Sequence, residues 1–287
     1  MTGYRVAIVG AGRMGQALGL ALAEARYSVV LLSRSTRALA PPLAIEVHDW
    51  ASRLAQSEVV LIATPDHAIE AVAERLGGEN AIGPDHAVFH VSGWHDRHAI
   101  RALEGSGAAL GSFHPLQAIA SPDHAAERLV GAYVGIEGDP RAVEVGMRMA
   151  RDLRMNPVEI PAGAKAGYHA GATIVASYTV ALMALASRVA ERAGIRPELA
   201  QRLYVPLLRG VSANLAQGDP AAALTGPIMR GDVETVAAHL AELAPEERPL
   251  YRALGRFALE LARSKGLDDV AVAGLARTLA DAEGRDG

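Results

Sequence analysis

A glycine-rich turn near the N-terminus constrains the fold of this chain more than any other feature. The turn follows the β-rich run Arg5–Val9 and precedes Met14–Ala25, whose Ala and Leu content favours a helix. Between them, the pattern GxGxxG is made by Gly10, Ala11, Gly12, Arg13, Met14 and Gly15. Glycines with this spacing, at the junction of a strand and a helix, are typical of a turn that binds a dinucleotide.

Each glycine of the turn has a predicted task. Gly10 permits the tight turn, Gly12 lets the backbone approach a pyrophosphate, and Gly15 lets the helix pack close to the strand. The helix N-terminus then faces the phosphates. A turn that only reverses the chain is the alternative, but the strand, helix and second strand have the spacing of a βαβ unit. We predict that all six residues of the turn contribute to the cofactor site.

The apolar runs that follow predict a parallel sheet covered on both faces. They lie at residues 29–32, 59–63, 88–91, 108–113, 133–136 and 156–160. Unalternating runs between helical segments are typical of strands buried on both sides. Beyond residue 160, Ala-rich stretches broken by Gly and Pro favour helices. We predict an α/β fold: a Rossmann doubly wound, mostly parallel sheet (residues 1–160) that binds the cofactor, then an all-helical C-terminal domain (residues 161–287) for substrate binding and dimerisation. A chain of 287 residues is long enough for two domains.

Composition narrows the class of partner. The 28 basic and 32 acidic residues give no basic excess, which argues against nucleic acid. The absence of cysteine excludes disulfides and thiolate-held metals. The N-terminus has no signal-peptide pattern, so we expect a cytoplasmic protein. Residues 166–187 carry no formal charge and could cross a bilayer by length, but their Ala, Gly, Thr, Ser and Tyr content favours a helix buried in protein over a membrane span.

The end of the second predicted strand bears on the choice of cofactor. An acid there would bind the ribose hydroxyls of NAD and repel a 2′-phosphate, but the sequence has Ser33, Arg34 and Ser35 instead. The guanidinium of Arg34 can fork onto a phosphate with the two hydroxyls beside it. The alternative is that Arg34 is a solvated loop residue. We predict NADP(H) as the cofactor.

Other strand ends should face the same crevice, because ligands of open parallel sheets lie outside the carboxyl ends of the strands. Thr64 and Pro65 follow one strand, Ser92 follows the next, and His114 follows a third. We assign the first three to cofactor binding and His114 to catalysis. For Thr64 and Ser92, helix capping or turn formation is the alternative.

A lysine and a histidine begin the long uncharged helix. Lys165 and His169 are four residues apart and therefore lie on one helix face. A desolvated lysine has a lowered pKa and can give or take a proton as a carbonyl is reduced, and His169 can orient the same oxygen or be the acid itself. Alternatively, Lys165 extends to solvent from a helix end and His169 packs between helices. We predict both as catalytic residues.

These features resemble the 6-phosphogluconate dehydrogenase-like superfamily. The start VAIVGAGRMGQAL is similar to its members, and LLSRS is similar to those that prefer NADP. The superfamily includes β-hydroxyacid dehydrogenases, ketopantoate reductases, pyrroline-carboxylate reductases and prephenate dehydrogenases. In several of them, a lysine and an asparagine four residues later touch the reacting oxygen. Lys165 matches the lysine, whereas His169 replaces the asparagine, so the resemblance leaves the proton path open.

A closer resemblance is to an uncharacterised family of Rossmann-like NADP oxidoreductases with a helical C-terminal domain. It is carried by VSG (91–93), GSFHPLQAI (111–119), KAGYHAGA (165–172) and LTGPIMRGDVETVAAHL (224–240). The likeness spans nearly the whole chain and implies the fold and cofactor, but the family has no established reaction. In the last segment we predict Asp232 as a helix N-cap. Arg230 is then free to bind an anionic group of the substrate.

Two readings of function remain open. In the first, the protein is an NADP(H)-dependent oxidoreductase that moves hydride to or from a small carbonyl, hydroxy-acid or imine substrate. In the second, it is a non-catalytic NADP(H)-binding sensor or assembly module. We also expect a homodimer through the helical domain. A metal site is disfavoured although six of the ten histidines lie between His86 and His124, because only His95 and His98 have the spacing of one helix face.

Overall fold

The computed structural model describes residues 4–36, 39, 41–121 and 124–280. The chain forms two compact units, Met1–Tyr178 and Thr179–Gly287. We predicted a domain boundary at residue 160, directly after the last strand ends at Glu159. The boundary between the two compact units lies further along the chain, inside helix α6 (Lys165–Arg192).

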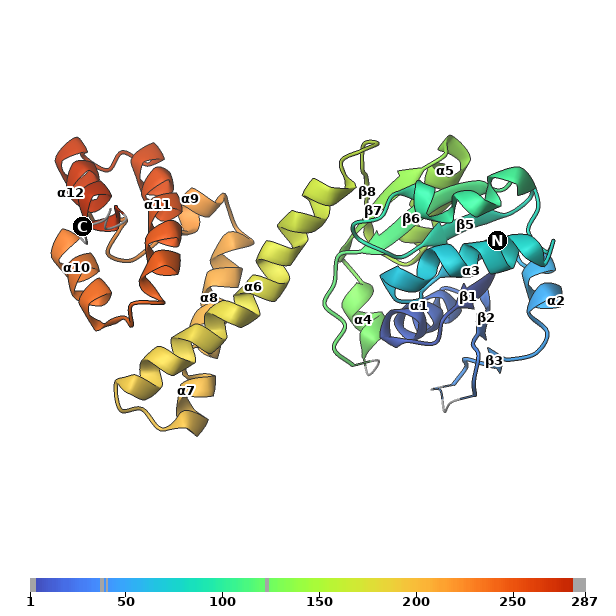
Figure 1. The fold of residues 1–287 in the computed structure, drawn as a ribbon, viewed down its shortest axis with the longest axis horizontal. Coiled ribbons are helices and arrows are strands. Elements are labelled where there is room, and N and C mark those ends of the chain that lie inside the picture. Colours follow the sequence, from blue (N-terminus) through green and yellow to red (C-terminus); the bar gives the residue numbers. More distant parts are fainter. Residues whose placement is uncertain (1–3, 37–38, 40, 122–123, 281–287) are drawn as a thin grey trace, which may run out of the picture. The chain divides into compact units, whose positions relative to one another are not determined.

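The first unit is built on one sheet, which has the order β3-β2-β1-β4-β5-β6-β7-β8 among the described residues (Figure 1). The strands are β1 (Arg5–Val9), β2 (Ser28–Leu32), β3 (Ile45–Glu46), β4 (Val59–Ile62), β5 (Ala87–His90), β6 (Ala109–Pro115), β7 (Tyr133–Gly138) and β8 (Asn156–Glu159). Neighbouring strands are parallel except β6 and β7. The predicted Rossmann-like, mostly parallel sheet is therefore confirmed.

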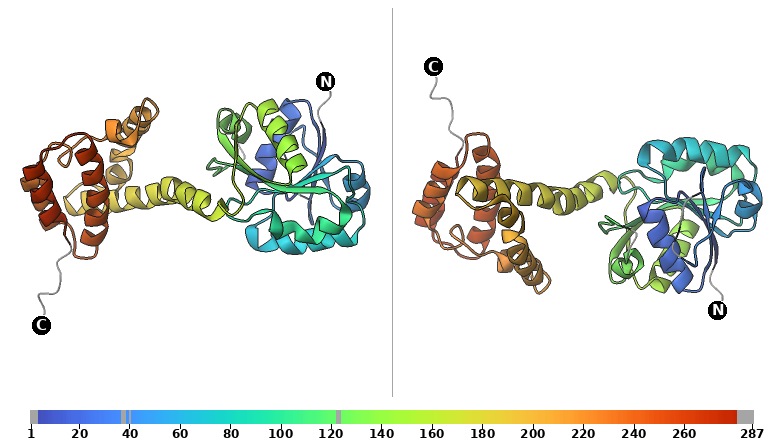
Figure 2. Two further views of the ribbon diagram at one scale, coloured as in Figure 1. Left: turned by 90° about the horizontal axis from the view of Figure 1, so that it is seen from above. Right: turned by 90° about the horizontal axis from the view of Figure 1, so that it is seen from below.

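Helices cover both faces of this sheet (Figure 2). One face packs on α1 (Arg13–Glu24), α4 (Ala125–Leu129) and α5 (Pro140–Asp152). The other packs on α2 (Trp50–Ala55), α3 (Ile69–Gly78) and the 3-10 element η2 (Arg97–Ser106); a shorter 3-10 element, η1 (Asp66–Ala68), follows β4. Every residue of β4 and β5 is buried, which explains why the strands show no alternation in sequence.

Two features of the sheet differ from what the sequence indicates. The two-residue strand β3 is too short to leave a pattern, yet it pairs with β2 and places Glu46 beside Leu32. The reversed direction of β7 is also invisible in the sequence, because a strand buried on both faces has the same apolar run in either direction.

The second unit is helical throughout its described part, which confirms the predicted all-helical C-terminal region. It holds the end of α6, then α7 (Pro197–Leu203), α8 (Val205–Leu215), α9 (Pro220–Ala223), α10 (Val233–Glu242), α11 (Arg248–Ser264) and α12 (Asp269–Leu279). Its core cluster comes from α10, α11 and α12 and includes Val236, Leu259 and Leu275. Asp232 caps α10 by accepting the Thr235 N–H at 3.0 Å, so the predicted N-cap is correct.

Helix α6 contains the long uncharged segment. Within the described residues it is the one helix long and apolar enough to cross a membrane, and none of its most apolar window is buried. The helix was predicted, but the predicted burial in protein is not found among the residues that the structure describes. Its exposed apolar surface therefore needs another explanation.

Candidate functional site

The glycine turn connects β1 to α1 and is tightly packed on its protein side. Gly10 has φ +115°, a conformation that favours glycine, and its N–H donates to the Leu32 carbonyl at 2.9 Å. A Cβ on Gly10 would lie 2.6 Å from the Ala63 carbonyl oxygen, and one on Gly15 would lie 2.0 Å from the Gly10 carbonyl oxygen. Both glycines are therefore required for β1, α1 and β4 to pack together.

Gly12 faces open space instead. It is the N-cap of α1, and a Cβ there would meet nothing within 4 Å among the described residues. Its φ of −72° and ψ of −175° are extended backbone that any residue can adopt. The glycine is not needed for the fold in this structure, which fits a position where the backbone approaches a pyrophosphate at the N-terminus of α1. Ala11 is buried, Met14 is half-buried, and the Arg13 guanidinium donates to the Ala120 carbonyl at 3.3 Å.

The residues predicted to bind the adenosine half of the cofactor lie at the carboxyl end of β2. The Ser33 N–H donates to the Glu46 carbonyl at 3.1 Å, and the Ser33 hydroxyl accepts the Ser35 N–H at 3.5 Å. Arg34 is exposed. Its guanidinium is therefore accessible to a phosphate in solution.

Glu46 is an acidic neighbour that the sequence analysis missed. Its Oε1 accepts the N–H groups of Val47, His48 and Asp49, and its Oε2 lies 3.7 Å from Arg53. The hydrogen bonds from His48 and Asp49 are the main cause of its lowered pKa. The carboxylate is therefore engaged in its own loop rather than presented to a ribose.

Thr64 follows β4 next to the glycine turn, since a Cβ on Gly10 would also lie 3.2 Å from the Thr64 N. Its hydroxyl is buried and has no hydrogen-bond partner among the described residues. Pro65, the next residue, precedes η1. A buried hydroxyl without a partner is costly unless a bound molecule supplies one. Together, the open Gly12 and the unpartnered Thr64 fit a cofactor on this edge of the sheet.

Lys165 is the central residue of the predicted catalytic pair. Its side chain is only 2% exposed, and its Nζ donates to the Ser92 carbonyl at 3.0 Å. Burial lowers the pKa of Lys165 to about 8, although the charges of Glu137, Asp96 and Asp66 act in the opposite direction. The side chain therefore does not extend to solvent, and near neutral pH it can exchange a proton.

Two histidines lie close to Lys165. The ring centroids of His114 and His169 are 5.8 Å apart and nearly perpendicular. A Cβ on Gly93 would lie 2.3 Å from His169 Nδ1 and 2.9 Å from His114 Cε1, so both rings pack on this glycine. Burial, followed by the charge of Lys165, lowers the pKa of His114 to about 3. His169 Nδ1 is buried without a partner in the part of the chain that the structure describes.

His90 organises the loop that holds Lys165, and the sequence analysis did not single it out. Its Nδ1 accepts the Ser92 N–H at 3.2 Å, so its Nε2 donates to the Asp96 carbonyl at 2.9 Å. The Ser92 hydroxyl accepts the His95 N–H at 3.3 Å. Burial lowers the pKa of His90 to about 4 and keeps the ring neutral. The hydroxyl of Ser92, which we predicted to bind the cofactor, thus shapes the loop, while its carbonyl positions Lys165.

The remaining predicted site residue, Arg230, belongs to the second unit. It is exposed, with its guanidinium 4.0 Å from the Asp232 carboxylate. Its assignment to the substrate stays a prediction. Among the described residues, no group of three or more His, Asp or Glu side chains could hold a metal ion.

Two family models match this chain. The model described as NADP oxidoreductase coenzyme F420-dependent matches residues 5–86, and the one described as Domain of unknown function (DUF2520) matches residues 132–258. The first match contains the glycine turn and Arg34. The second begins just before β7 and contains Lys165, His169 and Arg230. No curated protein matches this sequence.

Solved structures share the fold across nearly the whole chain. Protein TM1727 of Thermotoga maritima is 27% identical, with a TM-score of 0.70, over 91% of this chain and 99% of that one. A protein of Bacteroides fragilis described as a candidate NADP oxidoreductase is 19% identical, with a TM-score of 0.68, over 90% and 98% of the two chains. The pyrroline carboxylate reductase of Plasmodium falciparum, solved with NADP bound, is 11% identical, with a TM-score of 0.60, over 98% and 100%. The family models and these structures confirm the resemblance seen in the sequence: residues 5–86 are similar to NADP oxidoreductase domains, and residues 132–258 are similar to the DUF2520 domain.

Proposed function

We propose that this protein is an NADP(H)-dependent oxidoreductase that transfers hydride to or from a small carbonyl, hydroxy-acid or imine substrate. The observation that carries the proposal is Lys165, whose buried ammonium is fixed on the Ser92 carbonyl at 3.0 Å beside His114 and His169. A buried cation is costly, and here its pKa is lowered into the range where proton transfer is efficient.

The bound cofactor would supply or accept the hydride, and the side chains of the chain would manage the charge that develops on the substrate. Lys165 gives a proton to the substrate oxygen or nitrogen during reduction and takes it back during oxidation. His114 and His169 form one wall beside it. Arg230 is our candidate for an anionic group on the substrate.

A turnover assay separates this function from that of a non-catalytic NADP(H)-binding module. Purified protein and NADPH are incubated with a panel of 2-keto acids, keto-lactones and cyclic imines, and the loss of cofactor absorbance is followed. Turnover with at least one member is expected. Tight NADPH binding with no turnover across the panel would instead support a sensor or assembly role.

Arg34 should give the protein its preference for NADPH. Charged hydrogen bonds contribute about 1.5–3 kcal/mol, so Arg34→Ala should weaken NADPH binding about 10- to 100-fold. NADH has no 2′-phosphate, and its affinity should change by less than about two-fold on the same basis. Titration calorimetry with both cofactors measures this, and Arg101→Ala at an exposed arginine of η2 is the control. Equal losses for the two cofactors would show that Arg34 does not read the phosphate.

We also propose a cytoplasmic homodimer, because helices α6 and α8 leave two apolar stripes uncovered. On α6 the stripe contains Ile174, Tyr178 and Leu182, and on α8 it contains Leu207 and further residues at the same spacing. No residue of α8 is buried among the described residues. A short helix depends on tertiary packing for most of its stability, so α8 requires a covering surface.

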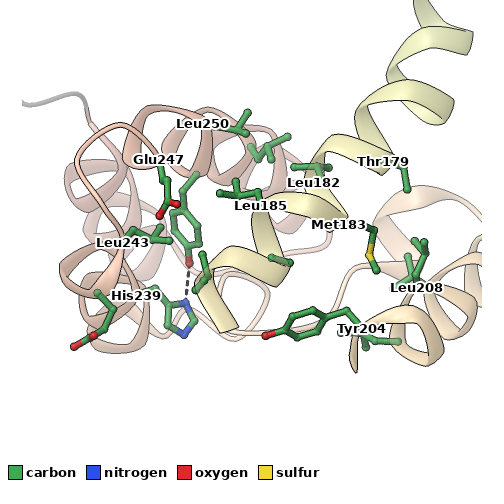
Figure 3. Close-up of a pocket in the computed structure, with 17 residues that line it drawn as sticks. Thr179, Leu182, Met183, Leu185, Tyr204, Leu208, His239, Leu243, Glu247 and Leu250 are labelled. Carbon is green, nitrogen blue, oxygen red and sulfur yellow. Dashed lines mark hydrogen bonds between the residues drawn. The ribbon is translucent and has the colours of Figure 1, made fainter. Parts of the chain in front are cut away.

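Leu182 of the α6 stripe and Leu207 of the α8 stripe also line an apolar pocket of 610 Å³ in the second unit, which Figure 3 shows. Its lining comes from α6, the α7–α8 segment, α10 and α11, and includes Leu182, Leu207 and Leu250. A fully exposed aliphatic side chain has an accessible area of roughly 100 Å². On this basis, the exposed fractions of the side chains in the stripes and around the pocket rim add up to roughly 500 Å² of apolar surface. A standard interface buries about 800 Å² per partner, somewhat more than half of it non-polar. The exposed apolar surface is thus about as large as the non-polar part of one side of such an interface. We therefore propose that a second copy of this chain covers it, rather than a lipid bilayer.

A charged residue introduced into the apolar stripe of α8 should dissociate the proposed dimer. Leu207 is 65% exposed and lines the pocket, whereas Val270 on α12 is 83% exposed and outside it. Leu207→Glu should shift the protein from dimer to monomer, because it would bury an unpaired charge in the interface. Val270→Glu should leave the dimer intact. Light scattering after size exclusion gives both masses, and a monomeric wild type would remove the proposal.

A further inference from the structure

Tyr168 contacts two of the residues in the candidate site, Lys165 and His114. It lies between Lys165 and His169 on α6, and its hydroxyl is 3.1 Å from His114 Nδ1. The two rings are nearly perpendicular, with centroids 5.6 Å apart. The Lys165 Nζ lies 5.6 Å from the centre of the Tyr168 ring. Tyr168 therefore contacts both the ammonium of Lys165 and the imidazole of His114.

We assign the hydroxyl of Tyr168 as the donor of this hydrogen bond. Burial raises the pKa of Tyr168 to about 12, so the phenol keeps its proton at neutral pH. A Cβ on Gly135 would lie 2.7 Å from the phenol oxygen, so the hydroxyl packs closely on the backbone of this glycine. His114 Nδ1 is the one hydrogen-bond partner of this hydroxyl among the described residues, so the phenol proton has an acceptor only if it points toward that nitrogen.

His114 is neutral and therefore has one N–H and one bare nitrogen. Its pKa of about 3 is caused first by burial and then by the positive charges that Lys165, His169 and His90 can carry. Since Nδ1 accepts from Tyr168, the hydrogen must be on Nε2. The Cε1 atom, which lies between the two ring nitrogens, packs on Gly93, next to the residue whose carbonyl holds Lys165.

We propose that Tyr168 is a positioning residue that fixes His114 as the Nε2–H tautomer, so that His114 serves the substrate as a neutral hydrogen-bond donor. In the reductive direction, Lys165 gives one proton to the substrate oxygen or nitrogen, and His114 keeps its own. A neutral donor stabilises developing negative charge without competing for the proton. The substrate role rests on the proposed function, whereas the tautomer does not.

Long-range 15N–1H NMR of the histidine side chains tests the tautomer on the full-length protein without substrate. His114→Gln identifies the signal. In the wild type, Nδ1 of His114 should be bare and Nε2 protonated, with no titration between about pH 5 and 9. Tyr168→Phe removes the donor and should give a mixture of tautomers, while its unfolding temperature reports whether the fold is retained. A protonated Nδ1 in the wild type, or signals unchanged in Tyr168→Phe, would overturn the proposal.

Kinetics test the role of His114 toward substrate. A glutamine amide can place an N–H where Nε2 lies, so His114→Gln should retain activity within about tenfold, whereas His114→Leu should lose about 100- to 1,000-fold. Tyr168→Phe should lower kcat about tenfold, the equivalent of one hydrogen bond, without moving the pH dependence set by Lys165. Equal losses in His114→Gln and His114→Leu would rule out a neutral donor. If the wild type shows no turnover, the proposed function fails, and the NMR result still decides the tautomer.

Discussion

Replacement of Lys165 by methionine lowers turnover by about 100- to 10,000-fold, the usual contribution of a positioned acid or base, and leaves NADPH binding unchanged. Methionine fills a similar volume in the buried site without the ammonium that donates to the Ser92 carbonyl. The matched control is Lys265→Met, because the sequence contains only these two lysines among its 28 basic residues. Lys265 is partly exposed and lies 3.5 Å from Asp219, so its loss should leave kcat unchanged.

The pH dependence of the wild type follows from the same residue. The pKa of Lys165 is lowered from 10.5 to about 8, so the ammonium is lost as the pH rises through about 8. Reduction needs the protonated form, and its kcat should fall above that pH; oxidation needs the free amine, and its kcat should rise. Both limbs should vanish in Lys165→Met. An unchanged profile in this variant, or activity equal to that of Lys265→Met, would assign the proton to another group.

Alanine at two glycines of the turn should separate cofactor binding from folding. Gly12→Ala places a methyl group in open space at the N-terminus of α1, whereas Gly15→Ala places one 2.0 Å from the Gly10 carbonyl oxygen. We expect Gly12→Ala to leave the free energy of unfolding unchanged and to weaken NADPH binding about 100-fold, equivalent to about 2.7 kcal/mol. Gly15→Ala should cost about 3 kcal/mol of stability or more, because backbone must move to relieve the contact.

Chemical denaturation and NADPH titration of the two variants check this pair. The informative result is the contrast, since both changes add the same methyl group. If Gly12→Ala binds NADPH as tightly as the wild type, the cofactor does not approach the turn at this residue. If Gly15→Ala is as stable as the wild type, α1 is not held against Gly10 as the structure shows.

Much of the first unit could be predicted from the sequence because its information is local. The glycine turn is a pattern of six residues, and buried strands such as Val59–Ile62 can be recognised by their apolar composition. The same is true of the helical second unit and of Asp232, whose capping role depends on its next neighbours. Strand direction and the short β3 were missed, since hydrogen bonds to distant segments decide them.

The candidate site divides in the same way. Lys165 and His169 were found by their spacing on one helix, and a further sign was available, because a chain that uses arginine almost everywhere has a lysine here, where only lysine can exchange a proton near neutral pH. His90 and Tyr168 were missed because nothing in the sequence around them indicates a long-range partner. Their roles come from hydrogen bonds to the Ser92 loop and to His114.

By itself, the sequence determined the glycine turn, the order of strands and helices, and the residue types available for chemistry, because short-range periodicity and backbone sterics encode these directly. Only the tertiary structure decided which of those residues meet. Burial lowers the pKa values of Lys165 and His114, and pairing across 73 residues of chain brings Lys165 to Ser92. Desolvation and proximity are properties of the packed chain, and they bring a lysine and a histidine together with pKa values well below their usual ones.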